Sequence, residues 1–202
     1  MRLYESDLVF DFDDSAWIIK KYDDHQYYNK LRGAGLKGVD FIGIYKQETV
    51  VFIEVKNFRD RNPYYREPFA VLKETNLFIT KMADKLVDTF RATTAIAAFL
   101  RKKWWYRLFL KVEKFIPSQW YIRQDWAFWH IVHQLAAQRS NICFVLWLEI
   151  EERISDKGKI DLSLHIDKQL EKELAEFTDK VVVASVEQPV YVDDLKVFFE
   201  AQ

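Results

Sequence analysis

Asp40, Glu54 and Lys56 are the residues whose types and spacing best fit a chemical role. They lie in VDFIGIYKQETVVFIEVK (39–56), which predicts two strands joined by a tight turn centred on Gln47. Asp40 and Glu54 are equally far from that turn, so they would face each other across an antiparallel pair. Lys56 lies two positions beyond Glu54 and would point the same way. The pattern therefore predicts two carboxylates and an ammonium group on one face of a hairpin.

This grouping suits a divalent cation. Both strands are apolar on both faces, so they are expected in the middle of a sheet. Carboxylates at the end of a buried hairpin repel each other and lose hydration, and a cation relieves both costs. Asp40, Glu54 and the Val55 carbonyl are the expected ligands of Mg²⁺ or Mn²⁺. Lys56 would orient an attacking water and stabilise phosphoryl charge. The alternative is a structural ion pair between Lys56 and the carboxylates.

The segments GVDFIGI and VVFIEVK resemble the PD-(D/E)XK nuclease superfamily, which has the restriction-endonuclease-like fold. Val39-Asp40 stands at the family's Pro-Asp position without the proline, and Glu54-Val55-Lys56 matches its acidic-x-Lys triplet. The resemblance implies a mixed sheet flanked by helices, dependence on Mg²⁺, and cleavage of DNA more than RNA; nucleases of this size often act as homodimers. The family also contains members without activity, so a module that only binds nucleic acid or a protein is the alternative.

Four more residues are candidates for the same site. Family members often add an acid from the first helix, where Asp23 and Asp24 stand, although N-capping is the favoured role for Asp23. A polar residue from the helix after the second strand often joins as well. Lys85 and Asp88 share one face of that expected helix, with a solvated face as the equal alternative.

The segment RKKWWYRLFLKVEKF (101–115) interleaves basic and aromatic residues. An amphipathic helix with its aromatic residues in the core is the first interpretation, a nucleic-acid contact the second, and a membrane-surface helix the third. The candidate nucleic-acid contacts are Arg101, Lys102, Lys103, Trp104 and Arg107.

Composition predicts one domain spanning 1–202. The chain has 202 residues, half of them apolar, and a net charge of −1, which suits a single sizeable core. The one cysteine, Cys143, cannot form an internal disulfide and fits a reducing cytoplasm. No apolar run approaches the roughly 20 residues of a membrane helix. A cytoplasmic protein without a membrane span is therefore expected.

The expected elements alternate between strands and helices. Residues 8–12 and 16–22 are predicted to form a hairpin, with a helix over 14–31 as the alternative, and 57–68 is predicted to be a loop. The other predicted strands are 39–45, 49–56, 142–150, 159–166 and 181–186, and the predicted helices are 24–32, 72–100, 104–115, 121–138, 167–177 and 193–199. This order predicts an α/β (α+β) class, with helices flanking a mixed central sheet.

Overall fold

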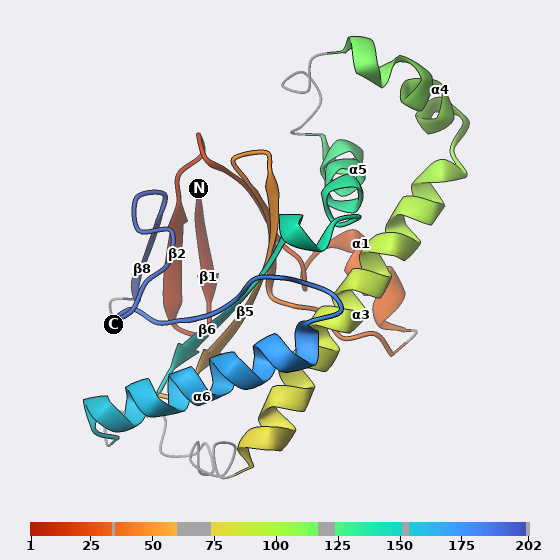
Figure 1. The fold of residues 1–202 in the computed structure, drawn as a ribbon. Helices are drawn as coiled ribbons and strands as arrows, with labels where there is room; N and C mark the ends of the chain where they lie inside the picture. The colour runs from red at the N-terminus through yellow and green to blue at the C-terminus, as the bar shows by residue number, and fades with distance from the viewer. Residues whose placement is uncertain (34, 60–73, 117–123, 151–153, 201–202) are drawn as a thin grey trace.

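A computed structural model describes residues 1–33, 35–59, 74–116, 124–150 and 154–200 (Figure 1). Within them the chain forms a five-stranded mixed sheet, a three-stranded antiparallel sheet and a set of helices. The predicted class, a mixed central sheet flanked by helices, is confirmed. Among these residues, no helix has the length and apolar character needed to cross a membrane.

The central sheet has the strand order β3-β4-β5-β6-β7. β3 (Trp17–Lys21), β4 (Phe41–Tyr45) and β5 (Thr49–Asn57) are antiparallel neighbours, while β6 (Ile142–Glu149) and β7 (Val181–Ala184) continue the sheet in parallel with β5. All eight residues of β6 are buried. Continuous apolar runs of this kind suit strands that are covered on both faces.

Helices cover one face of the central sheet. Strand residues such as Phe52 and Phe144 share a core with Leu86 of the long helix α3 (Thr75–Arg101) and with Leu170 of α6 (Asp156–Leu174). The remaining helices are α1 (Gln26–Arg32), α4 (Trp104–Val112), α5 (Asp125–Leu135) and two short 3₁₀ turns, η1 (Glu113–Phe115) and η3 (Arg139–Asn141).

A small sheet covers the other face. It has the order β1-β2-β8, from β1 (Arg2–Glu5), β2 (Leu8–Phe12) and β8 (Leu195–Phe199). Phe10 of β2 lies 5.2 Å from Phe41 and 5.4 Å from Trp147 between ring centroids, so aromatic packing joins the two sheets. The central sheet is thus enclosed between helices and this small sheet.

The predicted hairpin of 8–12 with 16–22 is wrong, although both strands exist. They belong to different sheets because a turn at Asp13 redirects the chain. The Asp13 carbonyl accepts from the N–H groups of Ala16 and Trp17, and the Ala16 carbonyl accepts from Lys46 N at the tip of the β4–β5 hairpin. β3 therefore joins β4, and the alternative helix over 14–31 is also wrong, because helix α1 begins only at Gln26.

Two further predicted elements are wrong in type. Residues 159–166 are the first half of helix α6, whose N-cap Ser155 accepts from Gly158 N, and not a strand. Residues 195–199 form strand β8, not a helix, because they pair with β2 along its whole length. Both segments alternate or cluster apolar residues in ways that suit either element, and their packing partners decide between them.

The predicted loop at 57–68 lies outside the described residues from residue 60 on. The predicted helix starts at 72 and 121 lie outside them as well. The described helices begin at Thr75 and Asp125.

Candidate functional site

The β4–β5 hairpin has the predicted register. Phe41 pairs with Ile53 and Tyr45 pairs with Thr49, so the turn of residues 46–48 is centred on Gln47. Lys46 and Gln47 have φ values of 47° and 60°, the left-handed conformations of the tight turns that suit twisted strands. Asp40 directly precedes β4 and donates its N–H to the Ile53 carbonyl at 3.1 Å. Asp40 is therefore brought to the same end of the hairpin as Glu54.

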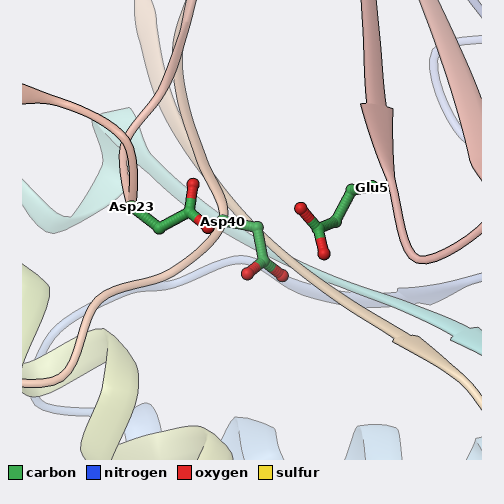
Figure 2. A group of neighbouring side chains, drawn as sticks. All are labelled: Glu5, Asp23 and Asp40. Carbon is green, nitrogen blue, oxygen red and sulfur yellow. The ribbon is translucent and has the colours of Figure 1, made fainter.

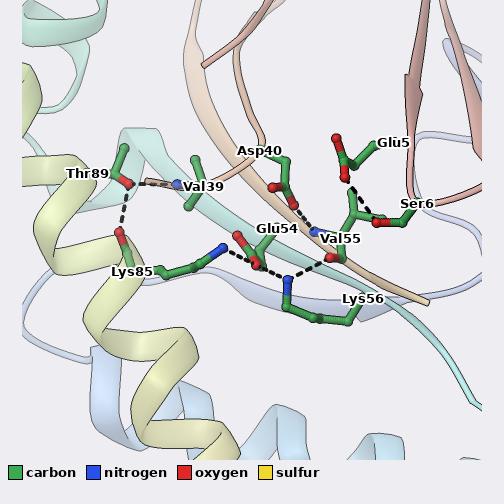
Figure 3. Close-up of polar contacts among 9 residues, drawn as sticks. All are labelled: Glu5, Ser6, Val39, Asp40, Glu54, Val55, Lys56, Lys85 and Thr89. Atoms are coloured by element: carbon green, nitrogen blue, oxygen red, sulfur yellow. Dashed lines mark hydrogen bonds and ion pairs between the residues drawn. The ribbon is translucent and has the colours of Figure 1, made fainter. Parts of the chain in front are cut away.

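Glu54 is the centre of a cluster with Asp40, Lys56 and Lys85, here called the Glu54 cluster. Its side chain is fully buried, and its Oε1 accepts from Lys56 Nζ and, at 2.6 Å, from Lys85 Nζ (Figure 3). Its other oxygen, Oε2, has no hydrogen-bond partner among the described residues. A buried acceptor without a partner costs free energy, so Oε2 is an available ligand atom in an otherwise satisfied group.

Lys56 and Lys85 reach Glu54 from two elements, β5 and α3 (Figure 3). Their side chains are 28% and 24% exposed, so both ammonium groups are accessible from solvent while paired. Lys56 Nζ also donates to the Val55 carbonyl at 2.9 Å. A carbonyl has two lone pairs, so this bond leaves Val55 available as the predicted third ligand.

The Asp40 carboxylate lies beside this group and is 8% exposed. Its Oδ2 accepts from Val55 N at 2.7 Å, so its position is fixed by the backbone of β5. Burial, and next the charge of Glu54, raise the pKa of Asp40 to about 7, although Lys56 opposes the shift. The two lysines therefore only partly compensate the carboxylates.

Helix α3 is attached to the hairpin next to the site. Thr89 Oγ1 donates to the Lys85 carbonyl at 2.7 Å and accepts from Val39 N at 3.0 Å, directly before Asp40 (Figure 3). Burial lowers the pKa of Lys85, but the Glu54 carboxylate outweighs it and the net pKa is raised. Lys85 is thus a charged member of the cluster. Asp88 is not, because it accepts from Lys37 N and pairs with Arg91.

A second acidic group shares Asp40. Carboxylate oxygens of Glu5, Asp23 and Asp40 lie within 4.8 Å of one another, and Figure 2 shows the three side chains pointing toward a common region. Burial raises the pKa of Asp23, and its Oδ1 is buried without a hydrogen-bond partner in the part of the chain that the structure describes. Lys21 Nζ lies 3.0 Å from Glu5 Oε2 and forms an ion pair with it.

Asp23 therefore belongs to the acidic group with Glu5 and Asp40. It is not a helix cap. Helix α1 begins at Gln26, and His25 Nδ1 accepts from Tyr27 N at 3.2 Å, which is the capping bond. Asp24 is exposed, and its Oδ2 lies 3.7 Å from Lys21 Nζ. Sequence reasoning missed Glu5, because only the pairing of β1 with β2 brings this residue to the site.

The donor set fits a hard divalent cation. Carboxylates supply oxygen ligands of the kind that Mg²⁺ and Mn²⁺ prefer. Two of the buried oxygens, Glu54 Oε2 and Asp23 Oδ1, have no hydrogen-bond partner within the described ranges. Asp40 belongs to both acidic groups and lies between elements that are far apart in the chain. Among the described residues, the carboxylates of Glu5, Asp23 and Asp40 lie close enough together to hold such an ion, and Figure 3 shows Glu54 near Asp40.

The five predicted nucleic-acid contacts lie away from this cluster. Arg101 ends α3, sixteen residues after Lys85, which corresponds to about 24 Å along a helix. Arg101 Nη2 lies 3.4 Å from His133 Nε2, and the other four residues are on or directly before α4. Figure 1 shows α4 at the far end of α3 from the sheet.

No family model, curated protein or solved structure matches this chain. The resemblance to the PD-(D/E)XK superfamily thus stays a prediction from the 39–56 motif.

Proposed function

We propose that this protein is a Mg²⁺-dependent (or Mn²⁺-dependent) nuclease of the PD-(D/E)XK type that hydrolyses phosphodiester bonds, in DNA more than in RNA. The observation that supports it is the fully buried Glu54 carboxylate, which keeps Oε2 unpartnered beside Asp40 and two ammonium groups. A site that served only to stabilise the fold would satisfy that oxygen, because buried acceptors normally find partners. We infer that an external cation completes it.

Each residue has a distinct role in this proposal. Bound by Asp40 and Glu54, the cation supplies a Lewis acid that acidifies water and neutralises charge on phosphoryl oxygens. Lys56, held by Glu54 and the Val55 carbonyl, is accessible enough to donate a hydrogen bond to an attacking water or to the scissile phosphate. Lys85 fixes the orientation of the Glu54 carboxylate from α3.

Nucleic acid is the proposed substrate class because the 39–56 motif resembles that family, and DNA is the substrate that the family most often cuts. One such site cuts one strand, so cleavage of both strands of a duplex would use two copies of the chain. A homodimer on DNA is therefore part of the proposal, and light scattering of the protein with and without duplex DNA would measure it.

The competing function is a nuclease fold that binds nucleic acid or a protein without catalysis. One observation favours it: Glu54 Oε1 already accepts from both lysines, which is the structural ion pair expected of an inactive site. In that case the cluster would need no metal, and replacing the lysines would not affect the binding of nucleic acid or protein.

Nuclease assays distinguish the two. Wild-type protein is incubated with plasmid DNA, single-stranded DNA and RNA in Mg²⁺, Mn²⁺ or EDTA. We expect metal-dependent cleavage that falls at least about 100-fold in Asp40→Asn and in Lys56→Ala, because each removes a group that stabilises the transition state. Asp88→Asn, on α3 but outside the cluster, is the matched control and should retain activity.

Two results would contradict the catalytic assignment. The first is undiminished cleavage by Asp40→Asn or Lys56→Ala purified in parallel. The second is no cleavage of any substrate together with no rise of the melting temperature Tm on adding Mg²⁺ or Mn²⁺, which would favour the binding module.

A further inference from the structure

Helix α4 and the following turn η1 carry an apolar surface that faces solvent. Trp104 is 71% exposed, Leu108 55% and Phe115 85%, and Val112 is exposed as well. Their spacing of three or four residues places them on one side of the helix. These four residues are here called the α4 apolar stripe. A contiguous exposed apolar patch of this kind typically marks an interaction surface.

The opposite side of α4 holds the helix in place. Tyr106 is buried and its hydroxyl lies 2.6 Å from His130 Nδ1 of α5, while the ring of Phe109 packs on Trp126 at 4.5 Å. The first interpretation of the segment, aromatic residues in the core, is therefore right for this side only. Because α4 is already anchored to α5, the α4 apolar stripe is displayed by a fixed helix.

Basic residues surround the stripe. Between 101 and 112 the sequence has five basic residues and no acidic one. All five are exposed: Arg101, Lys102, Lys103, Arg107 and Lys111. The next acid, Glu113, is paired with His130 at 2.8 Å and compensates none of them directly. The surface that carries the α4 apolar stripe is thus strongly positive.

An anionic lipid membrane matches both properties at once. A helix with Trp, Phe and Leu on one side and Lys or Arg beside them typically lies in the plane of the headgroups, with its apolar side chains at the acyl boundary. Tryptophan and long basic side chains suit this interface because each has an apolar body and a polar end. Duplex DNA would satisfy the charges but would leave Leu108, Val112 and Phe115 in water.

We propose that the α4 apolar stripe docks on an anionic lipid surface, with Trp104, Leu108 and Phe115 inserted at the headgroup boundary. Arg107 and Lys111 lie one turn apart on the flank of the stripe and contact lipid phosphates. Lys85 of the Glu54 cluster lies about 24 Å along α3 from Arg101, where α3 ends just before α4, so docking leaves the cluster accessible. This proposal is independent of the nuclease proposal, and either can fail alone.

Vesicle co-sedimentation tests it. The 202-residue protein is mixed with vesicles of phosphatidylcholine alone or of phosphatidylcholine with phosphatidylglycerol. We expect binding to the anionic vesicles only, and a loss of about tenfold or more in the double variant Trp104→Ser/Leu108→Ser, since less apolar surface can insert. The charge variant Arg107→Glu/Lys111→Glu should lose binding as well.

A matched control comes from α6, where Ile160 and Leu164 are exposed apolar residues with the same four-residue spacing. Ile160→Ser/Leu164→Ser should bind anionic vesicles like wild type, and Tm should be unchanged in both double-serine variants. As a second readout, the blue shift of tryptophan fluorescence on anionic vesicles should shrink in Trp104→Phe.

Three results would overturn the proposal. One is no binding of wild type to anionic vesicles. Another is binding that Trp104→Ser/Leu108→Ser leaves unchanged. The third is absent vesicle binding together with a different effect of the double-serine variant, either a loss of affinity for single-stranded DNA or a changed oligomeric state in light scattering. Either effect would mean that the stripe serves another partner.

Discussion

The lysines of the Glu54 cluster and the lysines around α4 stand in opposite environments. Lys56 and Lys85 are mostly buried and share one carboxylate oxygen, Glu54 Oε1. Lys102 and Lys111 are exposed on a stretch without acids. In the first region opposite charges are paired within the fold, so a change there alters stability. In the second, charge faces outward, and a change there should alter only binding.

The largest expected effect is on the free energy of unfolding in Glu54→Ala. This variant leaves two mostly buried ammonium groups without their partner, and breaking a buried ion pair in this way costs about 3 kcal/mol. Urea unfolding followed by circular dichroism measures it. Asp88→Ala, which removes a carboxylate of α3 outside the cluster, is the comparison and should cost less. A Glu54→Ala loss no greater than that of Asp88→Ala would contradict the central position of Glu54.

A smaller effect, of opposite sign, is expected for Asp40→Asn in metal-free protein. The pKa of Asp40 is raised to about 7 in the fold by burial and by Glu54, above its value of 3.8 in the unfolded chain. The folded state therefore holds a proton that the unfolded state has released between these values, and the Asp40 contribution to stability is lost as pH rises toward 7.

Replacement by a neutral amide should remove that loss. In EDTA at pH 8 we expect Tm of Asp40→Asn to exceed that of wild type by about 3–6 °C, and the difference to vanish near pH 4. Differential scanning fluorimetry over this pH range checks it. An Asp40→Asn variant that is less stable than wild type at pH 8 would show that the carboxylate is compensated within the fold.

The smallest expected effect is on the stability of the α4 variants. Because the α4 apolar stripe is exposed, Trp104→Ser/Leu108→Ser should change the free energy of unfolding by no more than about 0.5 kcal/mol. Urea unfolding beside Glu54→Ala completes the comparison of the two regions. A loss of the same size in both would mean that the stripe is packed in solution.

The register of the hairpin could be predicted from sequence because local chemistry determines it. Lys46 and Gln47 form the tight turn, and the apolar run on each side fixes which residues face each other. Lys85 could be predicted only as one of two candidates, since helical spacing does not say how far α3 rotates toward β5. The contact of Thr89 with Val39 decides that rotation.

Other parts depended on contacts that no local pattern encodes. Glu5 reaches Asp40 because β1 pairs with β2 and the small sheet covers the central one. The alternation of Ile160, Leu162, Leu164 and Ile166 suggested a strand, but the core contacts of α6 recur every four residues at Ile166, Leu170 and Leu174. In the helix, Leu162 and Ile166 pack on the core while Ile160 and Leu164 are exposed, so the alternation separates two sides of α6 as it would two faces of a strand.

The most direct test of the proposed metal site is anomalous diffraction from a crystal soaked in Mn²⁺. We predict an anomalous peak from a manganese ion bound by Asp40 and Glu54, next to the carboxylates of Glu5 and Asp23. The peak should disappear in an Asp40→Asn crystal soaked in the same way. A wild-type crystal with manganese only at exposed carboxylates elsewhere, and none at Asp40 and Glu54, would contradict the proposal.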